Sequence, residues 1–242
     1  MKFTSTRGGQ EQVSASEAII RGIAADGGLF VPVSWPEKIS NLQALENLSY
    51  QELAYQIMKP FLADFSEEEL RSCIVKAYDE KFNTDLIAPL IHKAGVHFLE
   101  LYHGPTLAFK DMALTILPHL LKTAAGKLKN EREIVILTAT SGDTGKAALE
   151  GFAGVPGTQI IVFFPEHGVS EIQKRQMITQ TGDNTCVIGI EGNFDDAQSG
   201  VKAIFADKDL NSSMNKSGKM FSSANSINIG RLIPQIVYYC YA

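Results

Sequence analysis

Short apolar runs alternate with amphipathic segments over residues 96–242. Runs rich in Val, Ile and Phe predict strands, and segments with apolar residues at helical spacing predict helices. The predicted strands are residues 96–102, 132–139, 159–165 and 185–190, and the predicted helices are residues 111–125, 143–154, 170–180 and 194–207. Alternation of this length requires crossover connections, so we predict an α/β fold with a mostly parallel sheet and flanking helices. Ligands of such folds bind at the carboxyl ends of the strands.

Residues 1–95 show a helical pattern instead. Ser14 or Ser16 is a candidate N-cap of a helix that Gly27 would end, and Ser66 with Glu69 forms a capping box for another helix. Residues 50–65 have helical spacing as far as Pro60. We therefore divide the chain into a helical N-terminal region, residues 1–95, and an α/β domain, residues 96–242. Pro118, inside the helix predicted at 111–125, should either kink that helix or mark a later start, and the pattern leaves both open.

Composition narrows the classes of partner. The 242 residues are 45% hydrophobic and 20% charged, with a formal net charge of -5, and basic residues do not cluster. No basic patch indicates a nucleic-acid or membrane partner, so we expect a small-molecule ligand. Three widely separated cysteines predict neither a metal site nor a disulfide framework, and no run has the length of a membrane span, so we expect a cytoplasmic protein.

The segment "TATSGDTGKAA", Thr138–Ala148, follows the predicted strand at 132–139 and opens a helix. Glycines allow close approach of a ligand, and free amides at a helix start favour a phosphate or a carboxylate. The spacing does not fit the GxxxxGK[ST] pattern of nucleotide-binding loops, because Ala147 follows Lys146. A plain strand-to-helix turn capped by Ser141 or Asp143 is the structural alternative.

Lys110 lies in "LYHGPTLAFKDMA", Leu101–Ala113, beside the expected end of a strand and close to a helix start. Most lysines are solvated surface residues. A lysine in an apolar setting near a helix start can instead have a lowered pKa and form a Schiff base with a carbonyl compound. The two interpretations differ in whether a carbonyl cofactor or substrate is present.

Four segments together carry a family resemblance: "HGPTLAFKDMA", "LTATSGDTGKAA", "EGNFDDAQ" and "SSANSINIGRLIPQIVYY". Their combination resembles the threonine synthase family, pyridoxal phosphate enzymes of the tryptophan-synthase β-like fold. The early "STRGG" and "DGGLFVP" also resemble the N-terminal segment of that family, so the resemblance covers essentially the whole chain. It implies a lyase of threonine biosynthesis that converts O-phospho-L-homoserine and water into L-threonine and phosphate.

The resemblance also implies roles for individual residues. Lys110 would form the Schiff base with pyridoxal 5'-phosphate and move protons on the substrate carbons, and Asp143 would lie near the cofactor's 3-hydroxyl. The residues implied to bind the substrate carboxylate are Thr140, Ser141, Gly142 and Thr144. Those implied to recognise its phosphate are Asn225, Ser226 and Arg231, with Asn228 adjacent. A guanidinium binds phosphate through two parallel hydrogen bonds, which suits Arg231.

This chain departs from the family in its length. Family members have a further glycine-rich loop that cradles the cofactor phosphate, and a later hydroxyl residue that faces the pyridine nitrogen. We therefore expect an incomplete fold and an inactive fragment. We also expect an uncovered apolar stripe on the final helix that would favour self-association: Ile229, Leu232, Ile233, Ile236, Val237 and Cys240.

Two alternatives remain open, a catalytically incompetent interaction module and a related pyridoxal phosphate dehydratase. Of three other features, one stays open and two are interpreted as structural. His103 could line the site or pack locally, "EGNFDDAQ" is interpreted as a capped helix start, and the tyrosines at 238, 239 and 241 as core.

Overall fold

Four parallel strands form the central sheet of the protein, in the order β7-β6-β5-β8. The structure is a computed structural model, and it describes residues 1–41 and 43–242. The strands of the sheet are β5 (Glu133–Ala139), β6 (Thr158–Pro165), β7 (Thr185–Ile190) and β8 (Lys219–Ser223). The predicted α/β class with a parallel sheet is confirmed, although the sequence pattern missed β8, whose segment "KMFSS" lacks an apolar run.

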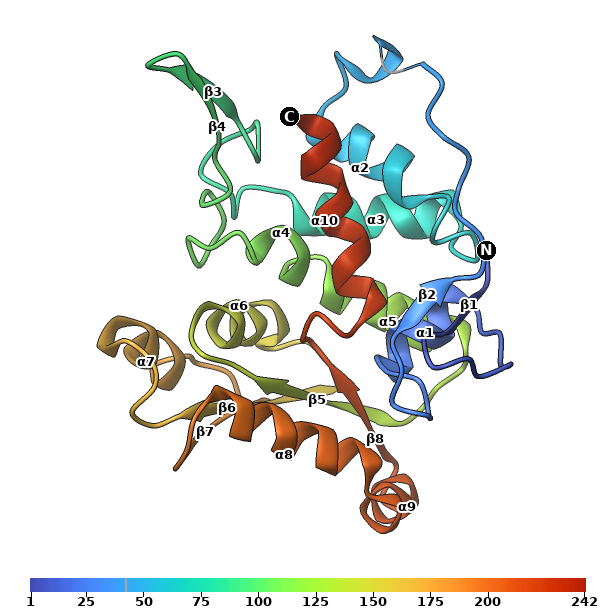
Figure 1. Ribbon diagram of the computed structural model, residues 1–242, viewed down its shortest axis with the longest axis vertical. Coiled ribbons are helices and arrows are strands. Elements are labelled where there is room, and N and C mark those ends of the chain that lie inside the picture. Colours follow the sequence, from blue (N-terminus) through green and yellow to red (C-terminus); the bar gives the residue numbers. More distant parts are fainter. Residues whose placement is uncertain (42) are drawn as a thin grey trace.

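Helices cover both faces of the sheet (Figure 1). The helices that connect its strands are α6 (Asp143–Phe152), α7 (Glu171–Ile178), α8 (Phe194–Ala206) and α9 (Lys208–Lys216). Successive side chains of β5 point to opposite faces of the sheet, as the period of two in a strand requires. Ile134 and Ile136 pack in the cluster that contains α6, whereas Val135 and Leu137 pack with Val201 of α8.

The remaining helices form a second body above the sheet in Figure 1. They are α1 (Ala15–Arg21), α2 (Tyr50–Met58), α3 (Glu67–Ala77), α4 (Asp111–Leu114), α5 (Leu117–Lys127) and α10 (Ile229–Tyr241), with a 3-10 turn at Gln43–Leu45. A short antiparallel pair, β1 (Phe3–Ser5) and β2 (Phe30–Pro32), lies beside α1. One cluster of buried side chains includes residues from both 1–95 and 96–242, and the division into two domains stays a prediction.

Helix boundaries follow the local signals with one exception. Ser14, one of the two predicted candidates, and Ser66 are N-caps with capping boxes to Glu17 and Glu69, of which the Ser66–Glu69 box was predicted. The expected end of the first helix at Gly27 is wrong, because the backbone already turns at Gly22, where φ is 69°. A glycine takes this left-handed conformation without a steric penalty, so the earlier glycine ends the helix.

Pro118 marks a later helix start rather than a kink. Helix α4 ends at Leu114, and α5 begins at Leu117 with Pro118 in its first turn. Proline is tolerated there because the first amides of a helix have no intrahelical acceptor. The predicted helix 111–125 is therefore two helices.

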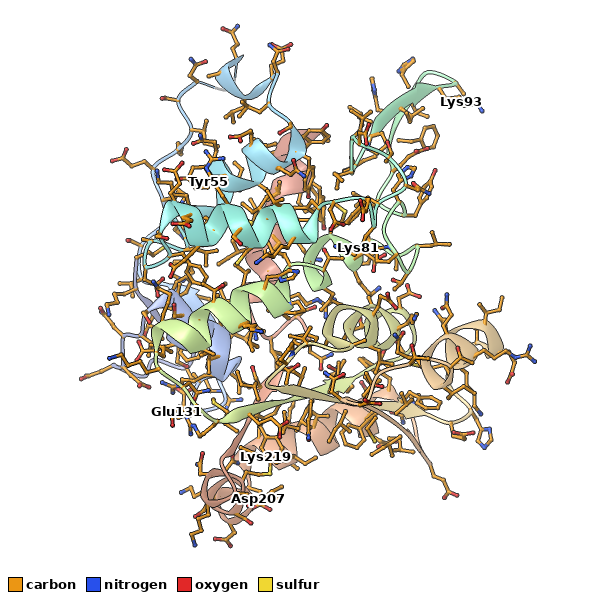
Figure 2. The ribbon with its side chains drawn as sticks, turned by 180° about the vertical axis from the view of Figure 1, so that it is seen from behind. Tyr55, Lys81, Lys93, Glu131, Asp207 and Lys219 are labelled. Atoms are coloured by element: carbon orange, nitrogen blue, oxygen red, sulfur yellow. The ribbon has the colours of Figure 1, made fainter. Side chains whose placement is uncertain are left out.

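The strand expected at 96–102 does not belong to the parallel sheet. Residues Val96–Leu99 form β4, which pairs antiparallel with β3 (Leu90–Lys93) in a separate hairpin. This hairpin, which carries Lys93, projects from the body of the protein (Figure 2). The periodicity of a strand shows which face is apolar but not which strand it pairs with, so Lys110 does not follow a strand of the main sheet.

The apolar stripe of α10 is mostly covered, contrary to expectation. Ile229, Ile233 and Val237 are buried, Leu232 and Ile236 are half-buried, and only Cys240 is exposed. Helix α10 packs against α2 and α4, so the helical body described here already covers it. Exposed apolar side chains gather instead on the hairpin and near Lys110: Leu90, Ile91, Val96, Phe98, Leu107 and Phe109.

Among the described helices, none combines the length and the apolar character that crossing a membrane requires.

Candidate active site

Lys110 lies at the N-cap position of α4, with its amine directed at the start of α6. Its Nζ is 3.4 Å from Oδ2 of Asp143 and 4.3 Å from the centre of the Phe109 ring. The lysine side chain retains about a fifth of its possible exposure, 19%, so the amine is accessible. A primary amine held between an aromatic ring and a carboxylate is thus placed where the sequence predicted a reactive lysine.

Asp111 holds the loop that presents Lys110. Its buried carboxylate accepts hydrogen bonds from the backbone amide and the hydroxyl of Thr106, at 2.8 and 2.6 Å. Burial raises the pKa of Asp111, and the two hydrogen bonds from Thr106 oppose that shift. Gly104 packs so closely that a Cβ there would lie 2.5 Å from the Asp111 side chain. The "HGPT" and "KD" parts of the motif are therefore one folded unit.

The loop between β5 and α6 is organised around Thr140. Its buried hydroxyl accepts hydrogen bonds from the amides of Gly142 and Gly145, at 3.0 and 2.9 Å. A Cβ on Gly145 would lie 2.5 Å from the Thr140 methyl group, so only glycine fits there. Among the described residues, the amides of Ser141, Asp143 and Thr144 have no hydrogen-bond acceptor. These free amides at a helix N-terminus are suited to an anion.

Asp143 is the first residue of α6 and is fixed from a second side by Gln173 of α7. The amide nitrogen of Gln173 donates a hydrogen bond to Oδ1 of Asp143 at 2.7 Å, while Oδ2 faces Lys110. The Gln173 oxygen in turn accepts a hydrogen bond from the Ser170 hydroxyl at the N-cap of α7. Glycine is favoured at position 142 because its φ of 151° is strained for other residues, and a Cβ there would also displace the Gln173 amide, 2.5 Å away.

Arg231, in the first turn of α10, is a buried cation that pairs with no carboxylate in the described part of the chain. It is 3% exposed, its Nη1 donates to the carbonyl of Ala224 at 2.9 Å, and its Nε has no hydrogen-bond partner among the described residues. Burial lowers the pKa of Arg231 to about 10. A buried guanidinium with an unused donor is costly unless an anion binds it, which indicates an anion site.

The neighbours of Arg231 that the sequence analysis selected have scaffold contacts. The side chain of Asn225 bonds both backbone groups of Ala139, at 2.8 and 3.1 Å, and so continues the pairing of β8 with β5. Asn228 caps α10 and donates to the carbonyls of Ile19 and Ser223. Ser226 is exposed between them. Ser226, the guanidinium of Arg231 and the second N–H of the Asn225 amide have free donors among the described residues, and all three residues line one cavity.

A cavity of about 230 Å³ joins these elements. Its lining residues are Ala139, Thr140, Ser141, Thr144, Phe194, Gln198, Val201, Lys202, Asn225, Ser226, Ile227 and Arg231. The structure thus brings together the predicted residues of both loops, except Lys110, Gly142 and Asp143, which lie outside this lining set. Asp143 connects the two parts, because it contacts Lys110 and directly precedes Thr144 in α6.

Helix α8 contributes to this cavity, which the sequence did not predict. "EGNFDDAQ" is a capped helix start as predicted, with Asn193 accepting from the amides of Asp195 and Asp196. The same helix also presents Phe194, Gln198 and Lys202 to the cavity, and their spacing of four residues was the available signal. His103, by contrast, packs locally, bonded to Glu100 and Asn83.

Chemically, the arrangement offers the primary amine of a lysine beside a carboxylate and, across the start of α6, a cavity lined by free amides, hydroxyls and a guanidinium. An amine of this kind can form a covalent bond with a carbonyl carbon. The amides and Arg231 are suited to carboxylate or phosphate groups. The site fits a carbonyl compound at Lys110 together with an anionic substrate.

Comparison with known proteins gives a consistent result. A family model described as the threonine synthase N terminus matches residues 2–78. Threonine synthase of Pseudomonas aeruginosa is 42% identical over 245 residues, covering 100% of this chain and 50% of the relative. Human threonine synthase-like 1 is 41% identical, covering 96% of this chain and 33% of the relative.

Solved structures show the same relationship. Pyridoxal-phosphate-bound threonine synthase from Brucella melitensis superimposes with a TM-score of 0.86 and 38% identity, covering 99% of this chain and 51% of that one. Threonine synthase from Escherichia coli superimposes with a TM-score of 0.86 and 33% identity, covering 100% of this chain and 54% of that one. The chain spans about half the length of these threonine synthases. It belongs to the threonine synthase family and corresponds to the N-terminal portion of its members.

Proposed function

We propose that this chain supplies the lysine-bearing portion of a threonine synthase, which converts O-phospho-L-homoserine and water into L-threonine and phosphate with pyridoxal 5'-phosphate. The observation that carries the proposal is the buried, uncompensated guanidinium of Arg231 in a cavity that shares the start of α6 with Lys110. The amine and the anion site are thus parts of one structural unit.

The residues present fit the cofactor at its carbonyl end. Lys110 provides the amine that would hold it, and Asp143, fixed by Gln173, would face its ring substituents. Pyridoxal phosphate, when bound, supplies an electron sink that stabilises negative charge on substrate carbons. A cytoplasmic setting accords with Cys73, Cys186 and Cys240, which are all free thiols.

Each group of the chain then has a definable task. The free amides at Ser141 and Thr144 would hold the substrate carboxylate, and Arg231 would hold the phosphate that leaves from Cγ. Lys110 Nζ would accept a proton from a substrate carbon and return it to another, as a general base and acid.

A related dehydratase would use the same amine but would need no buried guanidinium for a phosphate. The unpartnered Nε of Arg231 therefore favours the phosphate ester as substrate. A chain that acts only as an interaction module would need neither group. We infer further that the 242 residues alone are inactive, because the chain spans about half of the relatives.

The test uses full-length protein incubated with pyridoxal phosphate. Release of phosphate and formation of threonine from O-phospho-L-homoserine support the proposal, and Lys110→Ala should reduce turnover by several orders of magnitude. Deamination of serine or threonine without phosphate release would favour the dehydratase. Absence of both reactions with full cofactor occupancy would favour an interaction module.

A further inference from the structure

Helix α8 provides a second basic side chain to the cavity that contains Arg231. Phe194, Gln198 and Lys202 are separated by four residues each, so they lie along one face of the helix, and all three line the cavity. Val201, which is 4% exposed, packs α8 against β5 and fixes the rotation of the helix. The placement of Lys202 beside the cavity therefore follows from the packing of the sheet.

Lys202 has no competing partner in the part of the chain that the structure describes. It forms no ion pair or hydrogen bond there, although its own helix carries two aspartates, Asp195 and Asp196. The carboxylate of Asp196 is already bound to the amide of Asn193 at 2.8 Å, and the lining of the cavity contains no carboxylate. The ammonium group of Lys202 is free to meet an anion that enters the cavity.

The charge of a phosphate ester can be compared with the positive charges that line the cavity. A phosphate monoester carries about -1.5 to -2 charges at neutral pH. Arg231 supplies one positive charge, and Ser141, Thr144 and Ser226 supply neutral donors only. The N-termini of α6 and α10 add partial charges of about +0.5 each at most. The free amides of α6 are assigned to the substrate carboxylate, so Arg231 and the start of α10 together offer the phosphate at most about +1.5. Lys202 is the other cation among the lining residues, and it can complete the charge that a dianion requires.

We propose that Lys202, with Gln198 beside it, supplies the second positive charge that recognises the doubly charged phosphate of the substrate. Lys202 is then a specificity-determining residue, and Arg231 is the buried anchor of the same group. This inference rests on the proposed function, because it concerns the phosphate of that substrate. The side chain of Lys202 is exposed, so its ammonium group is accessible to a phosphate that enters the cavity.

The test compares Lys202→Met and Lys202→Arg in full-length enzyme loaded with cofactor. Lys202→Met keeps a similar stem but removes the charge, and should raise KM for O-phospho-L-homoserine about tenfold while kcat changes less than about twofold, the range of one exposed charge-assisted contact. Lys202→Arg should restore KM to within about threefold. Lys208→Met, at an exposed lysine of α9 outside the cavity, is the matched control and should behave as wild type.

A pH series with inorganic phosphate as inhibitor separates recognition of charge from a structural role. Wild-type enzyme should bind phosphate more tightly as pH rises through its second ionisation, and Lys202→Met should lose most of that gain. Inorganic sulfate, which stays doubly charged over the same range, reports any ionisation of the protein itself.

The two proposals fail in different ways. If Lys202→Met matches wild type in KM and in the pH dependence while Arg231→Met loses phosphate binding, the role of Lys202 is wrong and the proposed function stands. If phosphate binds neither wild type nor Arg231→Met, and the substrate is not turned over, the proposed function itself is wrong. A tenfold rise in KM that Lys202→Arg rescues supports both.

Discussion

Replacing Arg231 with methionine should stabilise the protein in phosphate-free buffer and remove its stabilisation by phosphate. The reason is that the folded chain buries a guanidinium that lacks a carboxylate partner and leaves Nε without an acceptor among the described residues. Methionine has a similar linear stem and no charge. The substitution therefore removes a cost that only a bound anion offsets in the wild-type protein.

The magnitude follows from the structure. Burial lowers the pKa of Arg231 from 12.5 to about 10, which corresponds to roughly 3 kcal/mol of unfavourable free energy for the charged form at neutral pH. The hydrogen bond to Ala224 that is lost in the variant is worth about 1 to 2 kcal/mol. The net expectation is a gain of about 1 to 2 kcal/mol in the free energy of unfolding.

Urea unfolding at pH 7, with and without phosphate, measures both effects. Phosphate at a hundred times its Kd should stabilise wild type by about 2.7 kcal/mol and Arg231→Met by much less. Arg175→Met is the control, because Arg175 is 77% exposed and should change stability by less than about 0.5 kcal/mol. A loss of more than about 1 kcal/mol in Arg231→Met without phosphate, or equal stabilisation by phosphate, would show that Arg231 is a structural residue.

Three further predictions concern specificity, pH and chain length. Arg231→Lys in the full-length enzyme should lower kcat/KM about ten- to hundredfold, because one ammonium cannot make two parallel bonds to phosphate; an unchanged value would refute that contact. Burial, together with Lys81 and Lys76, lowers the pKa of His119, so folding stability should fall as pH drops below about 6.5. Urea unfolding at pH 7 and pH 5 should show a smaller loss for His119→Gln, and an equal loss would contradict this assignment. The 242-residue chain with pyridoxal phosphate should release no phosphate from O-phospho-L-homoserine in a colorimetric assay, and turnover would show that the portion is sufficient.

Local signals in the sequence predicted the features that depend on neighbouring residues. The Ser66–Glu69 capping box is confirmed because both partners lie within one helical turn. The alternation of strands and helices likewise predicted the parallel sheet. The strand at Val96–Leu99 was assigned to the wrong sheet because its partner depends on tertiary contacts, which its own pattern does not encode.

The candidate site likewise has features that the sequence predicted and features that depend on tertiary contacts. Lys110 was singled out by its local setting and Asp143 was assigned through the resemblance; they lie 33 positions apart, and the structure brings their side chains to 3.4 Å. Arg231 was predicted as a phosphate ligand, but its burial without a carboxylate partner became visible only with the fold. The structure adds a scaffold contact for Asn225, whose amide pairs with Ala139 and joins two strands, while its role as a ligand stays a prediction. Lys202 was missed because its approach to the cavity depends on how α8 packs.

Helix α10 illustrates why exposure is difficult to predict from periodicity. Its apolar stripe was correctly identified as one face, but Ile233 and Val237 are buried against helices from the N-terminal region rather than uncovered. An apolar face predicts that something covers it and does not say which segment does. For the same reason, the pattern did not predict that apolar side chains of the β3–β4 hairpin are exposed.

Chemical labelling of Lys110 tests the central claim most directly. Full-length protein is incubated with pyridoxal phosphate, reduced with borohydride, digested and analysed by mass spectrometry. The account predicts that the phosphopyridoxyl group is attached to Lys110 at a ratio near one per chain, with Lys146 on the nearby helix α6 unlabelled as an internal control. Stoichiometric labelling of another lysine, or none with the cofactor in excess, would contradict the assignment of Lys110 as the cofactor-binding residue.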